Sequence, residues 1–283
     1  MKLKSITIPP LVAVLLSIIS VQSGAAIAKT LFPAIGAATT ASLRIGISAI
    51  ILLAVYRPNL RAISKAQWKI VIPYGLALGA MNLIFYLSIE RIPLGLAVTL
   101  EFIGPLLLAV VGSRKITDFI WVALAAAGIA LIAPWKENGV DILGASLALV
   151  AGGFWALYIV LGGRISKIMD GGSAVATGML FASMLILPFG IAAGKMDSVT
   201  PGLFGLGIAL ALLSSAIPFT LEMKALKQIP ARTFSILMSL EPAMASLCAL
   251  IFLQEYLSLN EILAVVCVIA ASVGSTLTSR NQS

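Results

Sequence analysis

The sequence predicts an all-α integral membrane protein with ten transmembrane helices, arranged as two inverted repeats of five helices each. Three observations lead to this prediction. Of the 283 residues, 60% are hydrophobic and 11% are charged, whereas soluble domains average roughly half and a quarter. The hydrophobic residues gather in ten runs, each long enough to cross a bilayer, with short connections between them. One motif framed by prolines also occurs in both halves of the chain.

The repeated motif is an apolar helix between two prolines, with a carboxylate close to the second proline. The first copy is Ile92–Pro105, IPLGLAVTLEFIGP, and the second is Ile229–Pro242, IPARTFSILMSLEP, 137 residues later. Their glutamates, Glu101 and Glu241, lie just before the second proline without occupying equivalent positions. An offset close to half the chain length indicates a duplicated unit.

A membrane helix needs about 20 mostly apolar residues, and the runs meet this requirement in chain order. The predicted helices cover 9–28, 39–56, 70–89, 94–113, 117–134, 144–163, 174–194, 202–221, 233–253 and 260–279. They group into repeats at 9–134 and 144–279. The first run follows two lysines and also resembles a signal peptide. It is long enough to span, however, and its removal would break the arrangement of five helices plus five.

The placement of lysine and arginine predicts the orientation, because cytoplasmic loops carry an excess of both residues. With the N-terminus inside, fourteen of the nineteen fall on the cytoplasmic side, four fall outside, and Arg44 lies within a helix. Both termini are therefore expected in the cytoplasm. Five helices per repeat also make the second repeat enter the membrane from the opposite face. Inverted repeats of this kind are common in secondary transporters, with a site between the repeats.

Polar side chains inside the apolar runs mark the helix faces that we expect to line the bundle interior. Arg44 shares one face of its helix with Thr40 and Ser48, and the two motif glutamates lie in helices 94–113 and 233–253. Other polar candidates on interior faces are Asn82, Tyr86, Tyr158 and Ser239.

Arg44, Glu101 and Glu241 are the strongest candidates, since they lie roughly 8, 10 and 12 Å from the ends of their helices at 1.5 Å per residue. A proline inside a helix leaves a backbone carbonyl without its usual donor. Pro105 and Pro242 do so within one turn of a glutamate, which suits a polar cavity. A carboxyl group in a low-dielectric site holds its proton more readily than one in water. Both glutamates are therefore also candidates for carrying a coupling proton.

Each of these residues also has a plain structural interpretation. Lys29, Glu90 and Glu222 share polar helix faces with Gln22, Asn82 and Ser214 respectively, but they lie near the ends of predicted helices and could instead reach the interface by snorkelling. The tyrosines could be packing residues or interfacial anchors, and serines often bond neighbouring helices. Arg44 could form a buried ion pair with a carboxylate that only fixes packing.

The composition disfavours two other classes of protein. The chain has no histidine and neither an HExxH nor a GxSxG motif, so an intramembrane enzyme is disfavoured and no catalytic residue, metal site or cofactor is expected. A net charge of +8 would suggest nucleic acid as the partner of a soluble protein. Here the basic residues lie between apolar runs, where the lipid bilayer surface accounts for them, and no nucleic-acid partner is expected.

Several stretches of the chain resemble EamA repeats of the drug/metabolite transporter superfamily. One of these stretches is the first copy of the motif. The others are Gln22–Pro33 (QSGAAIAKTLFP), Gly79–Glu90 (GAMNLIFYLSIE), Ala216–Leu226 (AIPFTLEMKAL), Pro230–Pro242 (PARTFSILMSLEP) and Ala270–Thr278 (AASVGSTLT). Within that superfamily the chain is most similar to bacterial exporters of threonine and homoserine, along nearly its whole length. The resemblance implies a ten-helix carrier of the bacterial inner membrane that exports small amino acids in exchange for protons.

A zwitterionic amino acid in a dry site needs both a cationic and an anionic partner. Arg44, together with Lys29, is expected to face the substrate carboxylate. Glu101 or Glu241 is expected to face the ammonium group or to carry the proton. The remaining expected substrate contacts are Asn82, Tyr86, Tyr158 and Ser239.

Two other functions stay open at this point. The same fold could export another metabolite, such as an aromatic amino acid, a purine or a drug. The chain could also be a membrane sensor or assembly factor that transports nothing. The sequence leaves the oligomeric state open between monomer and homodimer.

Overall fold

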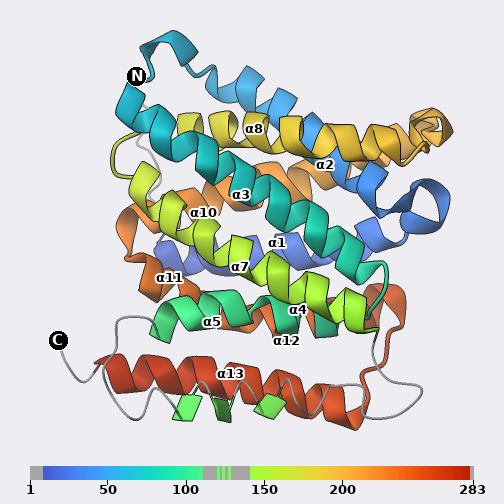
Figure 1. Cartoon of the computed structure of the whole chain (residues 1–283), viewed down its shortest axis with the longest axis vertical. Helices are drawn as coiled ribbons and strands as arrows, with labels where there is room; N and C mark the ends of the chain where they lie inside the picture. Colours follow the sequence, from blue (N-terminus) through green and yellow to red (C-terminus); the bar gives the residue numbers. More distant parts are fainter. Residues whose placement is uncertain (1–8, 111–119, 122, 125–126, 129–140, 281–283) are drawn as a thin grey trace.

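The computed structural model is a bundle of helices, and the structure describes residues 9–110, 120–121, 123–124, 127–128 and 141–280 (Figure 1). The helices of the first half are α1 (Pro10–Lys29), α2 (Phe32–Tyr56), α3 (Lys65–Ile89), α4 (Leu94–Glu101) and α5 (Ile103–Val110), with a 3₁₀ turn η1 (Leu60–Ala62). Those of the second half are α7 (Ile142–Ile165), α8 (Gly171–Ala192), α9 (Pro201–Ala211), α10 (Ile217–Gln228), α11 (Ala231–Leu237), α12 (Glu241–Cys248) and α13 (Leu259–Arg280). Shorter turns join them: η2 (Met196–Ser198), η3 (Leu212–Ala216), η4 (Met238–Leu240) and η5 (Ala249–Leu253).

The chain is a multi-pass membrane protein. Among the described residues, seven helical spans are long and apolar enough to cross a bilayer: Pro10–Lys29, Phe32–Tyr56, Lys65–Ile89, Ile142–Ile165, Gly171–Ala192, Pro201–Gln228 and Thr233–Leu253. Two shorter apolar helices, Leu94–Leu108 and Leu259–Ala271, accompany them. Nine of the ten predicted helices thus coincide with observed helices, and the prediction at 117–134 lies largely outside the described residues.

Several helices begin at residues whose side chains satisfy the free backbone N–H groups of a first turn. Ser64 and Gln67 form a reciprocal capping box at the start of α3. Asp141 accepts from the Gly144 N–H at the start of α7, and Thr200 accepts from the Leu203 N–H at the start of α9. The helix ends therefore follow from local sequence as well as from hydropathy.

The helices cross the bundle in alternating directions, and helices of the two chain halves pack against each other in pairs (Figure 1). The most extensive contacts between the halves are those of α3 with α7, α2 with α8, α3 with α8 and α1 with α10, and α4 also packs against α12. Close packing of α3 against α8 depends on Gly75, where an added Cβ would meet the backbone of Gly178. Helix α4, from the first copy of the repeated motif, thus packs against α12, which begins at the end of the second copy.

Several helices are interrupted in the middle of the bundle. Helix α4 stops at Glu101 and α5 resumes at Ile103. The span from α9 to α10 contains the π-helical turn η3, and the chain between α11 and α12 tightens into the 3₁₀ turn η4. Helix α2 is also kinked, but near its start, at Gly36, where the φ of 73° is one that glycine adopts readily. Such interruptions release backbone groups for contacts between helices.

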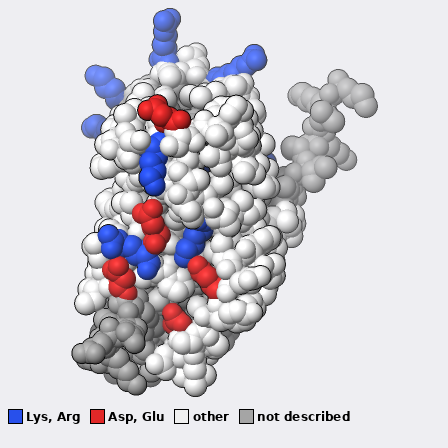
Figure 2. Space-filling view, turned by 90° about the vertical axis from the view of Figure 1, so that its right-hand side faces the viewer, with Lys and Arg blue, Asp and Glu red and all other residues white. Residues whose placement is uncertain are grey.

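At the end opposite the start of α1, acidic and basic side chains are interspersed on the surface (Figure 2). The Lys29 ammonium lies 2.6 Å from the Glu255 carboxylate, and Glu255 also accepts from the Leu94 N–H at 2.9 Å. Arg91 lies 3.1 Å from Asp141. The backbone N–H of Gly144 holds the pKa of Asp141 below its usual range. These contacts join connecting segments from both halves of the chain.

Candidate functional site

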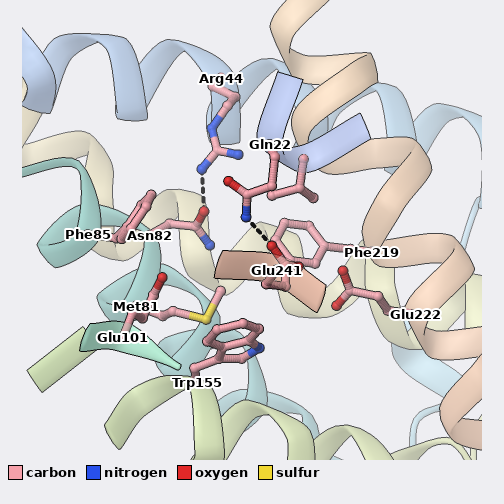
Figure 3. Close-up of a pocket in the computed structure, with 11 residues that line it drawn as sticks. Gln22, Arg44, Met81, Asn82, Phe85, Glu101, Trp155, Phe219, Glu222 and Glu241 are labelled. Carbon is pink, nitrogen blue, oxygen red and sulfur yellow. Dashed lines mark hydrogen bonds between the residues drawn. The ribbon is translucent and has the colours of Figure 1, made fainter. Parts of the chain in front are cut away.

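A buried cavity lies in the middle of the bundle, where helices of both halves meet. It measures about 50 Å³, and because a buried water needs about 10–15 Å³ on this scale, it holds a few waters or part of a small solute. The side chains around it come from α1, α2, α3, α4, α7, α10 and α12 (Figure 3). They are Val21, Gln22, Arg44, Met81, Asn82, Phe85, Glu101, Trp155, Phe219, Glu222 and Glu241.

Arg44 is the cation of this cavity and is held from three sides. Its guanidinium donates to the Ser214 carbonyl at 2.6 Å and to the Ser214 hydroxyl at 2.8 Å, and also to the Asn82 side-chain oxygen. It lies 4.7 Å above the centre of the Tyr86 ring. The Ser214 carbonyl is available because Pro218, four residues later, has no N–H to donate to it. The Arg44 Nε has no hydrogen-bond partner among the described residues.

Glu101 reaches the cavity from the last residue of α4. Pro105 cannot donate to the Glu101 carbonyl, and the helix breaks after this turn. Gly152 of α7 packs directly on that carbonyl, because a Cβ at this position would collide with it. The Glu101 side chain is 7% exposed and borders the cavity. Among the described residues, the structure gives its carboxylate no hydrogen-bond or ion-pair partner.

Glu241 enters the cavity from the first turn of α12, directly after the 3₁₀ turn η4. Its carboxylate accepts a hydrogen bond from the side-chain amide of Gln22 on α1 (Figure 3). The Gln22 Oε1 atom is buried and has no hydrogen-bond partner among the described residues. The pair therefore presents an amide acceptor and a carboxylate to the same cavity.

Glu222 is the third carboxyl group on the cavity, and it is 3% exposed. The Ser17 hydroxyl donates to one carboxylate oxygen at 2.6 Å, and the Tyr158 hydroxyl donates to the other at 3.0 Å. Of the two interpretations of Glu222, the interior helix face agrees with this burial, and the position at the membrane interface does not. The predicted helix stopped at 221, but α10 continues to Gln228 and buries this residue.

The cavity thus combines one guanidinium, three carboxyl groups and a largely apolar wall. The wall consists of Val21, Met81, Phe85, Trp155 and Phe219. Such a site complements a small solute that carries both a negative and a positive group. Among the described residues, no group of three or more His, Cys, Asp or Glu side chains is placed to hold a metal ion.

The predicted site residues fall into three groups. Arg44, Asn82, Glu101 and Glu241 line the cavity. Tyr86 lies beneath Arg44, and Tyr158 contacts Glu222, so both are one step removed from the cavity. Ser239 is buried in η4 and is not among the residues that border the cavity.

Two sequence-based expectations about charged partners need correction. Lys29 is not beside Arg44, because it lies at the end of α1 in its ion pair with Glu255. Arg44 does not form the expected packing pair with a carboxylate in the described part of the chain, since its partners are Ser214 and Asn82. The buried guanidinium therefore has no anion of its own there.

Several residues that border the cavity were not among the predicted site residues. Gln22 and Trp155 lie on helix faces that carry a second polar or aromatic residue, and this pattern was the available signal for both. Phe85, Met81 and Phe219 carry no such signal, because apolar side chains face both the cavity and the lipid.

Comparison with known proteins gives relatives along nearly the whole chain. A model described as the EamA-like transporter family matches residues 142–277. The threonine/homoserine exporter RhtA of Salmonella typhimurium (strain LT2) is 44% identical over 275 residues, which cover 96% of this chain and 93% of that protein. The threonine/homoserine exporter RhtA of Escherichia coli (strain K12) is 44% identical over 280 residues, or 97% of this chain and 93% of that protein.

One solved crystal structure has the same fold, with a TM-score of 0.68 over 96% of this chain and 99% of the other. Its sequence is 16% identical, so the likeness concerns the fold alone.

Proposed function

The chain belongs to the EamA-like transporter family, and from this membership we propose that it exports small amino acids, threonine and homoserine first, by exchange for protons. Two relatives named as threonine/homoserine exporters are similar over nearly the whole chain. The observation that carries the proposal is the buried cavity. It brings a guanidinium without an anionic partner and three carboxyl groups to a space with room for part of a small zwitterion.

The packing of the helices supports a plan of two inverted repeats, which alternating access would use. The second helix of each half pairs with its counterpart, as α2 with α8, and the fourth does the same, as α4 with α12. The first helix of each half packs against the third helix of the other half, as α1 does with α10 and α7 does with α3. This is the pattern that a two-fold axis between the halves would produce. Rocking about that axis would expose the cavity to each side in turn.

The cavity offers a partner to each charged group of an amino acid. In the proposed complex, the substrate carboxylate binds Arg44 at the unpartnered Nε. The ammonium group binds Glu101, whose carboxylate has no partner in the described structure, and the Gln22 Oε1. Each unsatisfied buried group costs about 1–3 kcal/mol, so a zwitterion relieves these costs on binding. Asn82 accepts from Arg44 and donates to the Leu78 carbonyl, and its second amide N–H would bond a side-chain hydroxyl of the substrate.

The orientation follows from the basic residues. With both termini in the cytoplasm of the bacterial inner membrane, the end at which α1 begins is cytoplasmic, and the end with the Lys29–Glu255 pair faces outward. Glu101 then lies in the outer half of the membrane, seven residues into α4.

Counterflow in proteoliposomes tests the substrate. Vesicles loaded with unlabelled threonine should accumulate labelled threonine and homoserine, but not phenylalanine or adenine. Vesicles without the protein should accumulate none of these compounds. If only phenylalanine or adenine is transported, the proposed substrates are wrong, while the conclusion about the fold stands. Binding of threonine without any flux would favour a membrane sensor.

A further inference from the structure

Glu222 is a buried carboxyl group that the proposed substrate contacts leave unused. Arg44 and Glu101 account for the two charges of a zwitterion, while Glu222 borders the same cavity from α10. It lies six residues before the end of α10 at Gln228, about 9 Å along the helix. Glu101 lies a similar distance from the opposite end, because it is seven residues into α4. The two carboxyl groups therefore border the cavity from opposite halves of the membrane.

The two hydroxyl groups that hold Glu222 suit both of its protonation states. Ser17 and Tyr158 contact different oxygens of the carboxylate, at 2.6 and 3.0 Å. A hydroxyl can donate or accept a hydrogen bond. The ionised carboxylate accepts from both hydroxyls, and the neutral acid donates to one and accepts from the other. Neither state leaves a buried oxygen without a partner.

The other helices packed against α10 bring no cation to Glu222 in the described structure. Helices α1, α7, α8 and α11 and the turn η3 contact α10. The groups that face Glu222 are Ser17 from α1 and Tyr158 from α7, and the Tyr74 ring of α3 stacks on Tyr158 at 5.2 Å. Arg44, Glu101 and Glu241 border the same cavity, and no ion pair joins Arg44 to Glu222 in the described structure. The sequences of α8 and η3 contain no charged residue. A lysine or arginine partner would have kept the group ionised.

We propose that Glu222 is a proton-carrying residue of this carrier, and that it passes the coupling proton between the cavity and the cytoplasmic end. In each cycle the O–H bond of its carboxylic acid breaks, the proton leaves on a cytoplasmic water, and the carboxylate keeps the electron pair. A proton that entered from outside by way of Glu101 then restores the acid. Ser17 and Tyr158 position the carboxyl group in both states. The inference rests on the proposed proton exchange and adds its cytoplasmic half.

Glu222→Gln separates this role from substrate binding, because an amide keeps the hydroxyl contacts but cannot titrate. Counterflow exchanges one threonine for another and needs no net proton movement, so the variant should keep it within about twofold. Accumulation of threonine driven by an imposed pH gradient should fall at least tenfold. Glu222→Asp should restore part of this accumulation, and Tyr158→Phe should shift its pH profile. Glu261→Gln is the control, because Glu261 caps α13 at the surface and glutamine also forms such caps.

The outcomes separate the competing roles. Accumulation by Glu222→Gln at the wild-type rate and pH profile would overturn the inference. Loss of counterflow by a Glu222→Gln protein with wild-type thermal stability would also overturn it, in favour of a substrate contact. Should the glutamine variant not fold, an unchanged pH profile in Tyr158→Phe and in Glu222→Asp would overturn the inference in its place. Absence of gradient-driven accumulation in the wild type would instead contradict the proposed proton exchange itself.

Discussion

Three glutamates border one cavity and differ in what holds them. Glu101 has no partner among the described residues, Glu241 accepts from the Gln22 amide, and Glu222 is held by two hydroxyls. An amide N–H can only donate, so it favours an oxygen that accepts and supports a charged or orienting role for Glu241. An unpartnered carboxyl group is available for a ligand or a proton. The three carboxyl groups are chemically identical, but their different hydrogen-bond partners suit them to different roles.

Replacing Glu101 by glutamine should abolish proton-driven export while the protein stays folded in the membrane, because the amide cannot carry a proton. Glu241→Gln should impair export more mildly and weaken threonine binding, since the amide of Gln22 loses its charged acceptor. Transport per folded molecule, measured across a pH series, checks both expectations. If the glutamates only fix packing, the first effect would be a loss of thermal stability, and the surviving protein would keep its pH dependence. An unchanged rate and pH profile in Glu101→Gln would rule out the coupling role.

At the scale of helices, the cavity depends on interruptions. Glu101 ends α4, Glu241 begins α12 after a 3₁₀ turn, and Ser214 lies in a π-helical turn. An unbroken helix in lipid satisfies all of its own backbone groups. Each break releases a carbonyl or redirects a side chain, and here the breaks of both halves meet in one place. Prolines near the breaks make the interruptions a property of local sequence.

Pro218→Ala tests whether a proline on one helix positions the arginine of another. The new N–H can donate to the Ser214 carbonyl and would compete with Arg44 for it. One hydrogen bond contributes about 0.5–1.5 kcal/mol, so the affinity for threonine should fall about two- to tenfold. The control is Pro188→Ala, because Pro188 lies on the exposed side of α8. Equal threonine affinity in the two variants would show that Pro218 does not position Arg44.

Two neighbouring glycines of α7 provide a matched test of the contact that holds Glu101. A Cβ at Gly152 would collide with the Glu101 carbonyl, whereas a Cβ at Gly153 meets nothing within 4 Å. Gly152→Ala should therefore destabilise the protein by about 1–3 kcal/mol and reduce transport by displacing Glu101. Gly153→Ala should be neutral, or stabilising by up to about 1 kcal/mol. Thermal unfolding in detergent, with transport measured alongside, distinguishes them, and equal effects would show that the packing contact is unimportant.

At the scale of the whole molecule, hydropathy predicted the helices well, because a bilayer demands long apolar runs. Position within a run also identified Arg44, Asn82, Glu101 and Glu241 as cavity residues. Glu222 was left between an interior face and the membrane interface because hydropathy falls there, while the helix itself continues for six more residues. Phe85 and Phe219 could not be identified, since an apolar side chain suits lipid as well as the bundle interior. The partner of Lys29 depends on how distant segments meet, and hydropathy contains no such information.

The orientation of the bundle makes a prediction that does not depend on the cargo. Reporter fusions should place both termini in the cytoplasm. Fusions near Arg61 and Arg164 should report the cytoplasm, and fusions near Glu137 and Asp197 should report the outside. The reason is the excess of basic residues in the segments assigned to the cytoplasm. A terminus found outside would invert the bundle and reverse the assigned direction of proton flow.

The central claim is that threonine moves outward in exchange for inward-moving protons, and gradient-driven accumulation tests it most directly. Purified protein is placed in vesicles with an acidic lumen, and labelled threonine is added outside at a higher pH. Threonine should accumulate in the lumen above its external concentration, and a proton ionophore should abolish this accumulation. Accumulation that survives the ionophore, or equilibration without accumulation in vesicles that show counterflow, would contradict proton exchange.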